Sequence, residues 1–76
     1  MKIVIKYCVA WNYGPRAASL AESLKNKGFN DIEMLKGSGG IFDVFSDGVL
    51  LFSKQIEHRL PNNDEIIDLI EHTKPK

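Results

Sequence analysis

The sequence contains a single cysteine, Cys8, among its 76 residues. No disulfide can therefore form within the chain. Small domains that fold without disulfides are typical of reducing compartments, so we expect a cytoplasmic location. A membrane location is not expected, because the opening apolar run is broken by Lys6 and is too short for a signal peptide or a membrane span.

The sequence also lacks an excess of charge of either sign. Ten basic residues balance ten acidic residues, and the isoelectric point is near 6.7. Proteins that bind nucleic acid or anionic lipid commonly carry a strong positive charge, which attracts them to phosphate groups. We therefore predict no nucleic-acid partner.

The composition does not indicate disorder. Hydrophobic residues make up 43% of the chain and charged residues 26%, which are the proportions of an ordinary globular protein. A chain of this length can bury only one core. We predict a single domain over residues 1–76, with a frayed tail at residues 73–76 that has no apolar anchor.

Hydrophobic periodicity and turn residues predict four strands and two helices. The strands are expected at residues 2–7, 31–36, 41–46 and 49–53; one helix should begin at Pro15 and end before Gly28, and Asn62 or Asn63 should cap the other. Asp47 and Gly48 form a strong hairpin signal between the last two strands. Residues 55–60 are expected to form a polar connector.

The order of these elements is β-α-β-β-β-α. It predicts an α/β (α+β) fold with a four-stranded mixed sheet and two helices that cover at least one face. The first two strands flank a helix, so they should be parallel through a right-handed crossover. A ferredoxin-like fold would need another strand after the last helix, and the charged residues from Glu71 onward cannot form it. A minimal thioredoxin-like fold fits better.

Two blocks of the sequence resemble the selenoprotein W-like, or Rdx, family. Residues 7–15 resemble the family's Cys-x-x-(Cys or Sec) segment, including the tyrosine and the proline that follow the motif. Residues 40–54 resemble its glycine-rich hairpin and the Ser-Lys pair that ends its last strand. The resemblance spans nearly the whole chain. It implies a thioredoxin-like fold and a thiol redox role in the cytosol.

The family's motif implies two positions that form a disulfide or selenenylsulfide, and this chain keeps only the first. Cys8 matches the first cysteine, whereas Trp11 stands at the second position. Indole has no sulfur, so two-cysteine exchange cannot occur within one molecule. At most, Cys8 could act as a monothiol oxidoreductase: it would attack a disulfide or a sulfenic acid, and glutathione or another protein would resolve the product.

Two interpretations of Cys8 remain open. Lys6 and Arg16 are close in sequence and could lower the pKa of the thiol, which would activate it. Alternatively, Cys8 is a small buried hydrophobic residue at the end of a core strand, as free cysteines commonly are.

The aromatic residues of the same loop also allow two interpretations. Trp11 and Tyr13, with Pro15 after them, could form the partner-binding loop of a redox-inert interaction module, because large aromatic side chains often anchor protein partners. Alternatively, Trp11 folds back over the sheet edge and fills the space left by the lost redox pair, while Tyr13 packs on the first helix.

We predict no resident cofactor and no metal site. His58 and His72 lack the spacing of zinc ligands, and the glycine-rich residues 37–40 lead into a strand, whereas phosphate-binding loops lead into a helix. The acidic residues of the last helix should form a solvated face; they are Asp64, Glu65, Asp68 and Glu71. Glutathione and a protein are the candidate partners, and the sequence leaves the oligomeric state open.

Overall fold

The structure, a computed structural model, describes residues 1–73. Its elements in chain order are β1 (Ile3–Cys8), α1 (Gly14–Asn26), β2 (Ile32–Gly37), β3 (Phe42–Ser46), β4 (Val49–Ser53), α2 (Lys54–Glu57) and α3 (Asn63–Thr73). Every predicted strand is present, and each of its ends lies within one residue of the predicted one.

The strands form one mixed sheet in the order β2-β1-β3-β4. β1 is parallel to β2 and antiparallel to β3, and β3 is antiparallel to β4. The predicted parallel pair and the predicted hairpin are therefore confirmed. Asp47 and Gly48 have φ values of 49° and 83°, and two consecutive positive values are what a type I′ hairpin turn requires.

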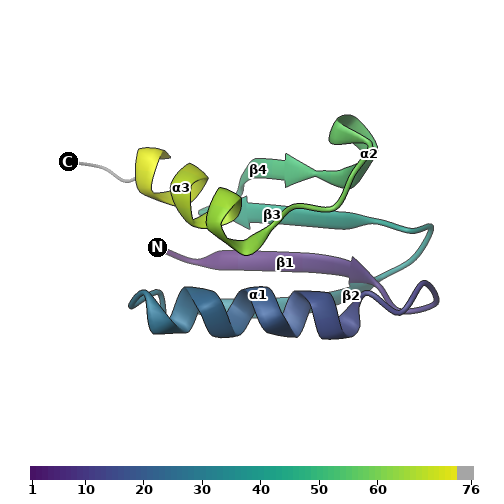
Figure 1. Cartoon of the computed structure of the whole chain (residues 1–76), viewed down its shortest axis with the longest axis horizontal. Coiled ribbons are helices and arrows are strands. Elements are labelled where there is room, and N and C mark those ends of the chain that lie inside the picture. Colours follow the sequence, from purple (N-terminus) through teal and green to yellow (C-terminus); the bar gives the residue numbers. More distant parts are fainter. Residues whose placement is uncertain (74–76) are drawn as a thin grey trace.

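The two long helices, α1 and α3, pack on the same face of the sheet and contact each other (Figure 1). Successive side chains of a strand point to opposite faces. Ile3 and Ile5 of β1 therefore lie under the helices, where both are fully buried, and Cys8 points away from them. The core beneath the helices consists of Ile3, Ile5, Ala17, Leu20, Ala21, Leu24, Phe42, Val44, Phe52, Ile66, Ile67 and Ile70.

The helix α1 begins one residue before the predicted start at Pro15 and ends as expected. Gly28 has a φ of 94°, a left-handed conformation that glycine adopts without steric cost. Its N–H donates to the Lys25 carbonyl and the N–H of Phe29 to the Leu24 carbonyl, each at 3.0 Å. This pair of bonds is a Schellman motif, which satisfies carbonyls left over at the helix end.

The segment after β4 differs from the prediction. Residues 55–60 were expected to be a connector, whereas residues 54–57 form the single helical turn α2, which His58 closes with a φ of 59°. A single turn is too short to show a hydrophobic period, so periodicity could not reveal it. The two predicted helices are α1 and α3, and α2 is additional to them.

Asn62 is the residue that caps α3. Its side-chain oxygen accepts a hydrogen bond of 2.9 Å from the N–H of Glu65, as an N-cap residue does. Thr73 is the last residue of α3, and residues 74–76, the rest of the segment predicted to be frayed, lie outside the described residues. Within residues 1–73, no helix has the length and apolar character needed to cross a bilayer.

Candidate functional site

The candidate site lies at one end of the molecule, on the right in Figure 1. There β1 and β2 end, β3 begins, α1 starts and β4 runs into α2. We call this region the loop end and define it as residues 8–16, 36–41 and 53–57. It contains Cys8, Trp11, Tyr13 and Pro15, the residues that the sequence pointed to.

Backbone hydrogen bonds fix the loop between β1 and α1. The N–H of Cys8 donates to the Ile41 carbonyl at 2.9 Å, and the N–H of Tyr13 donates to the Cys8 carbonyl at 3.2 Å. The loop turns at Asn12, which has a φ of 61°; asparagine tolerates this conformation better than most residues. The loop is therefore held both to the start of β3 and across its own base.

Cys8 is fully buried, with 0% of its surface exposed. Cys8 contacts the start of α1 through its carbonyl oxygen. This oxygen accepts a hydrogen bond from the N–H of Tyr13, the N-cap residue of that helix. A thiol reacts with a disulfide only when the sulfur can be reached. Reaction of Cys8 would therefore require a local opening of the structure that exposes the sulfur.

The structure does not pair Cys8 with Arg16. The guanidinium of Arg16 donates to the Pro61 carbonyl at 2.9 Å, just before α3. Lys6 precedes Cys8 by two residues on β1, so the two share a face of the sheet, but Lys6 is exposed to solvent. Pro15 is exposed in the first turn of α1.

Trp11 is 58% exposed and is held in place by other side chains. It makes an edge-to-face contact with Tyr13, with ring centroids 6.1 Å apart. Tyr13 makes a similar contact with Phe42 of the core, at 6.2 Å. Lys54 Nζ lies 5.1 Å from the centroid of the Trp11 ring and 5.9 Å from that of Tyr13, close enough for cation–π attraction.

Gly40 lies directly against Trp11. A Cβ atom at Gly40 would come within 2.9 Å of the indole ring, and the φ of Gly40 is 74°. Glycine is therefore favoured there both by the space that the ring occupies and by the backbone conformation. Trp11 lies over the connector between β2 and β3, with more than half of its surface open to solvent.

Sequence reasoning missed the roles of Gly40 and Lys54. Both belong to the second block that resembles the Rdx family, but nothing in their spacing indicates contact with a loop about thirty to forty residues earlier. The contact arises because β3 begins and β4 ends beside the carboxyl end of β1.

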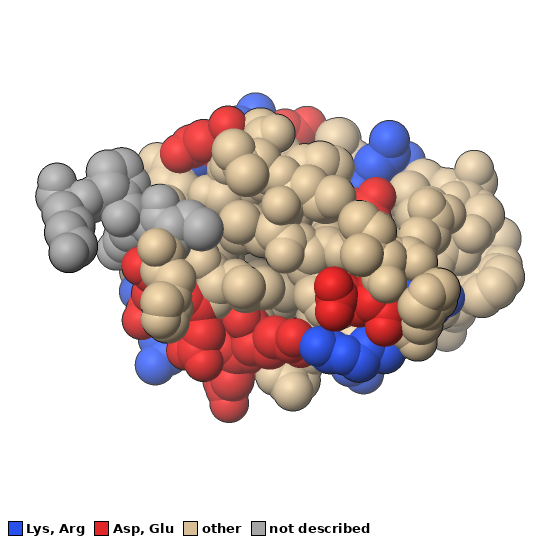
Figure 2. Space-filling model, turned by 90° about the horizontal axis from the view of Figure 1, so that it is seen from above, with Lys and Arg blue, Asp and Glu red and all other residues tan. Residues whose placement is uncertain are grey.

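The resolved pKa shifts lie away from Cys8 and Trp11. A hydrogen bond with Arg59 holds the pKa of Glu65 below its usual value, and a hydrogen bond with Glu33 raises the pKa of Lys2. In the view of Figure 2, acidic side chains gather along α3, whereas the far right tip, at the loop end, carries none. Within residues 1–73, no group of three or more His, Cys, Asp or Glu residues is placed to hold a metal ion.

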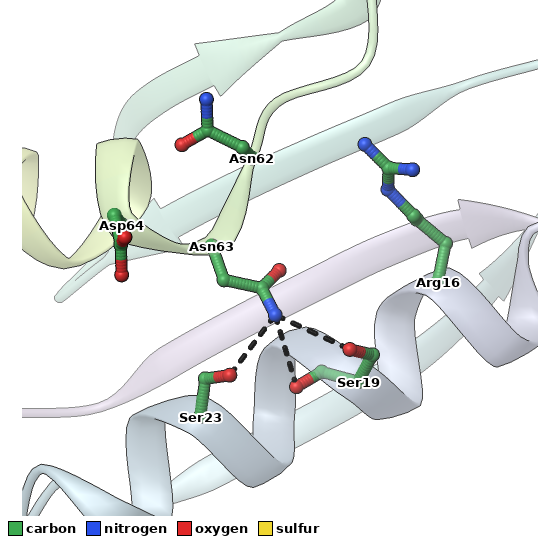
Figure 3. Close-up of a pocket in the computed structure, with 6 residues that line it drawn as sticks. All are labelled: Arg16, Ser19, Ser23, Asn62, Asn63 and Asp64. Carbon is green, nitrogen blue, oxygen red and sulfur yellow. Dashed lines mark hydrogen bonds between the residues drawn. The ribbon is translucent and has the colours of Figure 1, made fainter.

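A concave feature lies apart from Cys8 and Trp11, between α1 and the start of α3 (Figure 3). This cleft of about 720 Å³ is lined by Arg16, Ser19, Ser23, Asn62, Asn63 and Asp64. The Asn63 side-chain nitrogen points toward α1 and donates to the hydroxyl oxygens of Ser19 at 3.2 Å and Ser23 at 2.9 Å. These polar groups satisfy one another, so they join the two helices and leave little free for a ligand.

Solved structures of other proteins share the fold of this chain. A selenoprotein W-related protein from Vibrio cholerae is 26% identical, with a TM-score of 0.81 over 93% of this chain and 92% of that chain. A Bordetella parapertussis protein has the same fold, with a TM-score of 0.89 at 22% identity over 96% of each chain. No curated protein matches the sequence.

The family model named "Rdx family" matches residues 2–72, which includes both blocks that carried the resemblance. The resemblance is therefore confirmed, and its implications of a thioredoxin-like fold and a redox-type protein are consistent with the match. Because the match covers nearly the whole sequence, this chain belongs to the Rdx family.

Proposed function

We propose that the chain is a partner-binding module on the Rdx scaffold and that it contacts a protein through Trp11. The observation that carries this proposal is the contrast between the two motif positions. Cys8 is 0% exposed, whereas Trp11 is 58% exposed. The residue that could do thiol chemistry is withdrawn from solvent, and the residue that replaced its partner is presented to solvent.

The contacts of Trp11 support this role. Gly40, Tyr13 and Lys54 restrict its ring, so little side-chain freedom would be lost on binding. Rigid aromatic side chains that lose little entropy are common anchors of protein interfaces. Val9 of the same loop and Ile56 of α2 are also exposed, so the loop end carries further apolar side chains that a partner could cover.

Partner retention by immobilised variants tests the proposal. Trp11→Ala should reduce the retention of proteins that the wild type holds by about tenfold or more, the loss typical of an aromatic anchor. Cys8→Ala should retain them, because the buried sulfur touches no partner. Val49→Ala is the matched control, since Val49 is 61% exposed but lies in the hairpin at the opposite end. Retention lost with Cys8→Ala and kept with Trp11→Ala would contradict the proposal.

A monothiol activity of Cys8 is the second candidate, and the match of Cys8 to the first cysteine of the family motif favours it. The Cys8 thiolate would attack oxidised glutathione, forming a Cys8–glutathione disulfide and releasing one glutathione thiolate. This reaction needs a local opening of the structure, because the sulfur is buried.

Alkylation with iodoacetamide distinguishes the two candidates. We expect Cys8 to react far more slowly in the folded protein than in urea, and we expect no glutathione adduct by mass spectrometry. Rapid formation of a full adduct by the folded protein would favour the monothiol activity.

A further inference from the structure

We propose that the partner segment recognised at the loop end is acidic and presents a carboxylate beside an apolar side chain. This inference rests on the proposed function and names the chemistry of the partner. The apolar side chain would pack on Trp11, and a carboxylate would pair with the Lys54 ammonium beside it.

The loop end carries cations and almost no acids. Arg16, Lys36 and Lys54 belong to it, and Glu57 is its only acidic residue. The chain as a whole is neutral, so its acidic residues are concentrated elsewhere, for example along α3 (Figure 2). Among these cations, the Lys54 ammonium is the one that lies beside the exposed Trp11 ring. A local excess of positive charge beside an exposed ring favours a partner of the opposite charge.

Lys54 is placed to make this contact. The ion pairs among residues 1–73 join Lys2 to Glu33 and Arg59 to Glu65, so within that part of the chain Lys54 pairs with no carboxylate. Its ammonium lies over the Trp11 ring, and an ammonium has three hydrogen-bond donors. A carboxylate that approaches Trp11 from solvent can therefore be hydrogen-bonded by Lys54.

The alternative occupants are a second copy of this chain and a nucleic acid. A second copy could present the acidic side chains of α3, whereas a nucleic acid would use the cations and stack a base on Trp11. The acidic protein segment is favoured over nucleic acid because the loop end also has exposed apolar residues, Val9 at 52% and Ile56 at 65%, which cannot bind a phosphate backbone.

Trp11 is the only tryptophan, so its fluorescence reports directly on binding at the site. The probe is the peptide acetyl-Glu-Glu-Leu-Leu-Glu-Glu-amide, which does not fluoresce, and the matched peptide carries Gln in place of each Glu. We expect the acidic peptide to bind about threefold to fivefold more tightly than the Gln peptide, the ratio for one exposed ion pair. High salt should reduce this preference.

Variants of Lys54 identify the charge that is used. Lys54→Met should remove the preference for the acidic peptide, because methionine keeps an apolar stem but has no charge. Lys54→Arg should keep it, and so should Lys27→Met, which removes an exposed lysine from the opposite end of α1.

Several results would overturn the inference. These are equal binding of the two peptides, an unchanged preference in Lys54→Met, tighter binding of a single-stranded oligonucleotide, or self-association in sedimentation that Trp11→Ala abolishes. If the acidic peptide fails but Trp11→Ala still loses its retained proteins, only the inference fails. If Trp11→Ala keeps those proteins, the proposed function fails as well.

Discussion

The helix-covered face of the sheet and the loop end differ in what their residues do. Beneath α1 and α3, the aliphatic and aromatic side chains are buried against one another. At the loop end, Trp11 and Ile56 are exposed, and the ordering comes from backbone hydrogen bonds, a glycine and a cation–π contact. The contrast suggests that stability and binding reside in separate regions, which substitutions in each region can test.

The largest effect is expected from Leu24→Ala in the core. Leu24 is 0% exposed in α1, and such truncations cost about 2–5 kcal/mol because they lose buried contacts and leave a cavity. Urea unfolding should show this loss. Peptide affinity at Trp11, measured under conditions where the variant is folded, should be unchanged.

The same variant tests whether the two regions open separately. If the loop opens locally, the alkylation rate of Cys8 in Leu24→Ala should rise much less than the unfolding constant. An equal rise in both would show that Cys8 is exposed only when the whole core unfolds, and the separation of the two regions would then be wrong.

The covered face is also the part that the sequence predicted best. Its strands and long helices follow from local signals: the β-forming residues of β1, the Asp47 and Gly48 turn, and the Gly28 helix end. The short helix α2 was missed because a single turn carries no periodic face. His58 ends that turn with a positive φ. Histidine adopts this conformation more often than most non-glycine residues but still uncommonly, so the residue type alone does not predict it.

Two neighbouring glycines offer a matched test of how Trp11 is held. Gly39 and Gly40 have φ values of 73° and 74°, but only at Gly40 would an added Cβ meet the Trp11 ring, at 2.9 Å. Alanine at either position should cost about 1–2 kcal/mol, because L-residues are strained in this conformation. Only Gly40→Ala should also displace the ring.

The emission spectrum of Trp11 and its affinity for the acidic peptide are the measurements for this pair. Gly39→Ala should leave both as in the wild type once its lower stability is taken into account. Equal changes in the two variants would mean that backbone strain, and not contact with Gly40, positions the ring.

The sequence predicted where the candidate site lies, but not which of its side chains are buried, exposed or in contact. The motif and the aromatic residues pointed to the loop between β1 and α1, and the structure has Trp11 exposed there. The sequence left the burial of Cys8 open as one of two interpretations, and it gave no sign that Lys54 lies over Trp11. Both depend on how β3 and β4 lie beside the end of β1, and these contacts join residues far apart in sequence.

A smaller effect is expected from Asn62→Ala at the start of α3. Loss of the hydrogen bond from the Glu65 N–H to the Asn62 side chain should cost about 1 kcal/mol. Asn62→Ser should recover most of it, because serine is also a good N-cap residue. Thermal unfolding measures the difference. A deficit that serine does not recover would assign Asn62 a role other than capping.

The smallest effect is expected in the pH dependence of Arg59→Met. In the folded protein, Arg59 donates to Glu65 at 2.7 Å and lowers the pKa of that carboxyl below its ordinary value of 4.5. The unfolded chain then binds a proton more readily than the folded one, so this contact stabilises the fold above pH 4.5 and is lost as the pH falls through the lowered pKa. Wild-type stability should therefore decline with acid more steeply than that of Arg59→Met, by a small amount because the pair is exposed and screened by solvent.

Urea midpoints from neutral to acidic pH measure the slopes, and Lys27→Met controls for the loss of one positive charge. Equal slopes in wild type and Arg59→Met would mean that the contact adds nothing to stability, and the start of α3 would then depend on its Asn62 cap and its buried isoleucines.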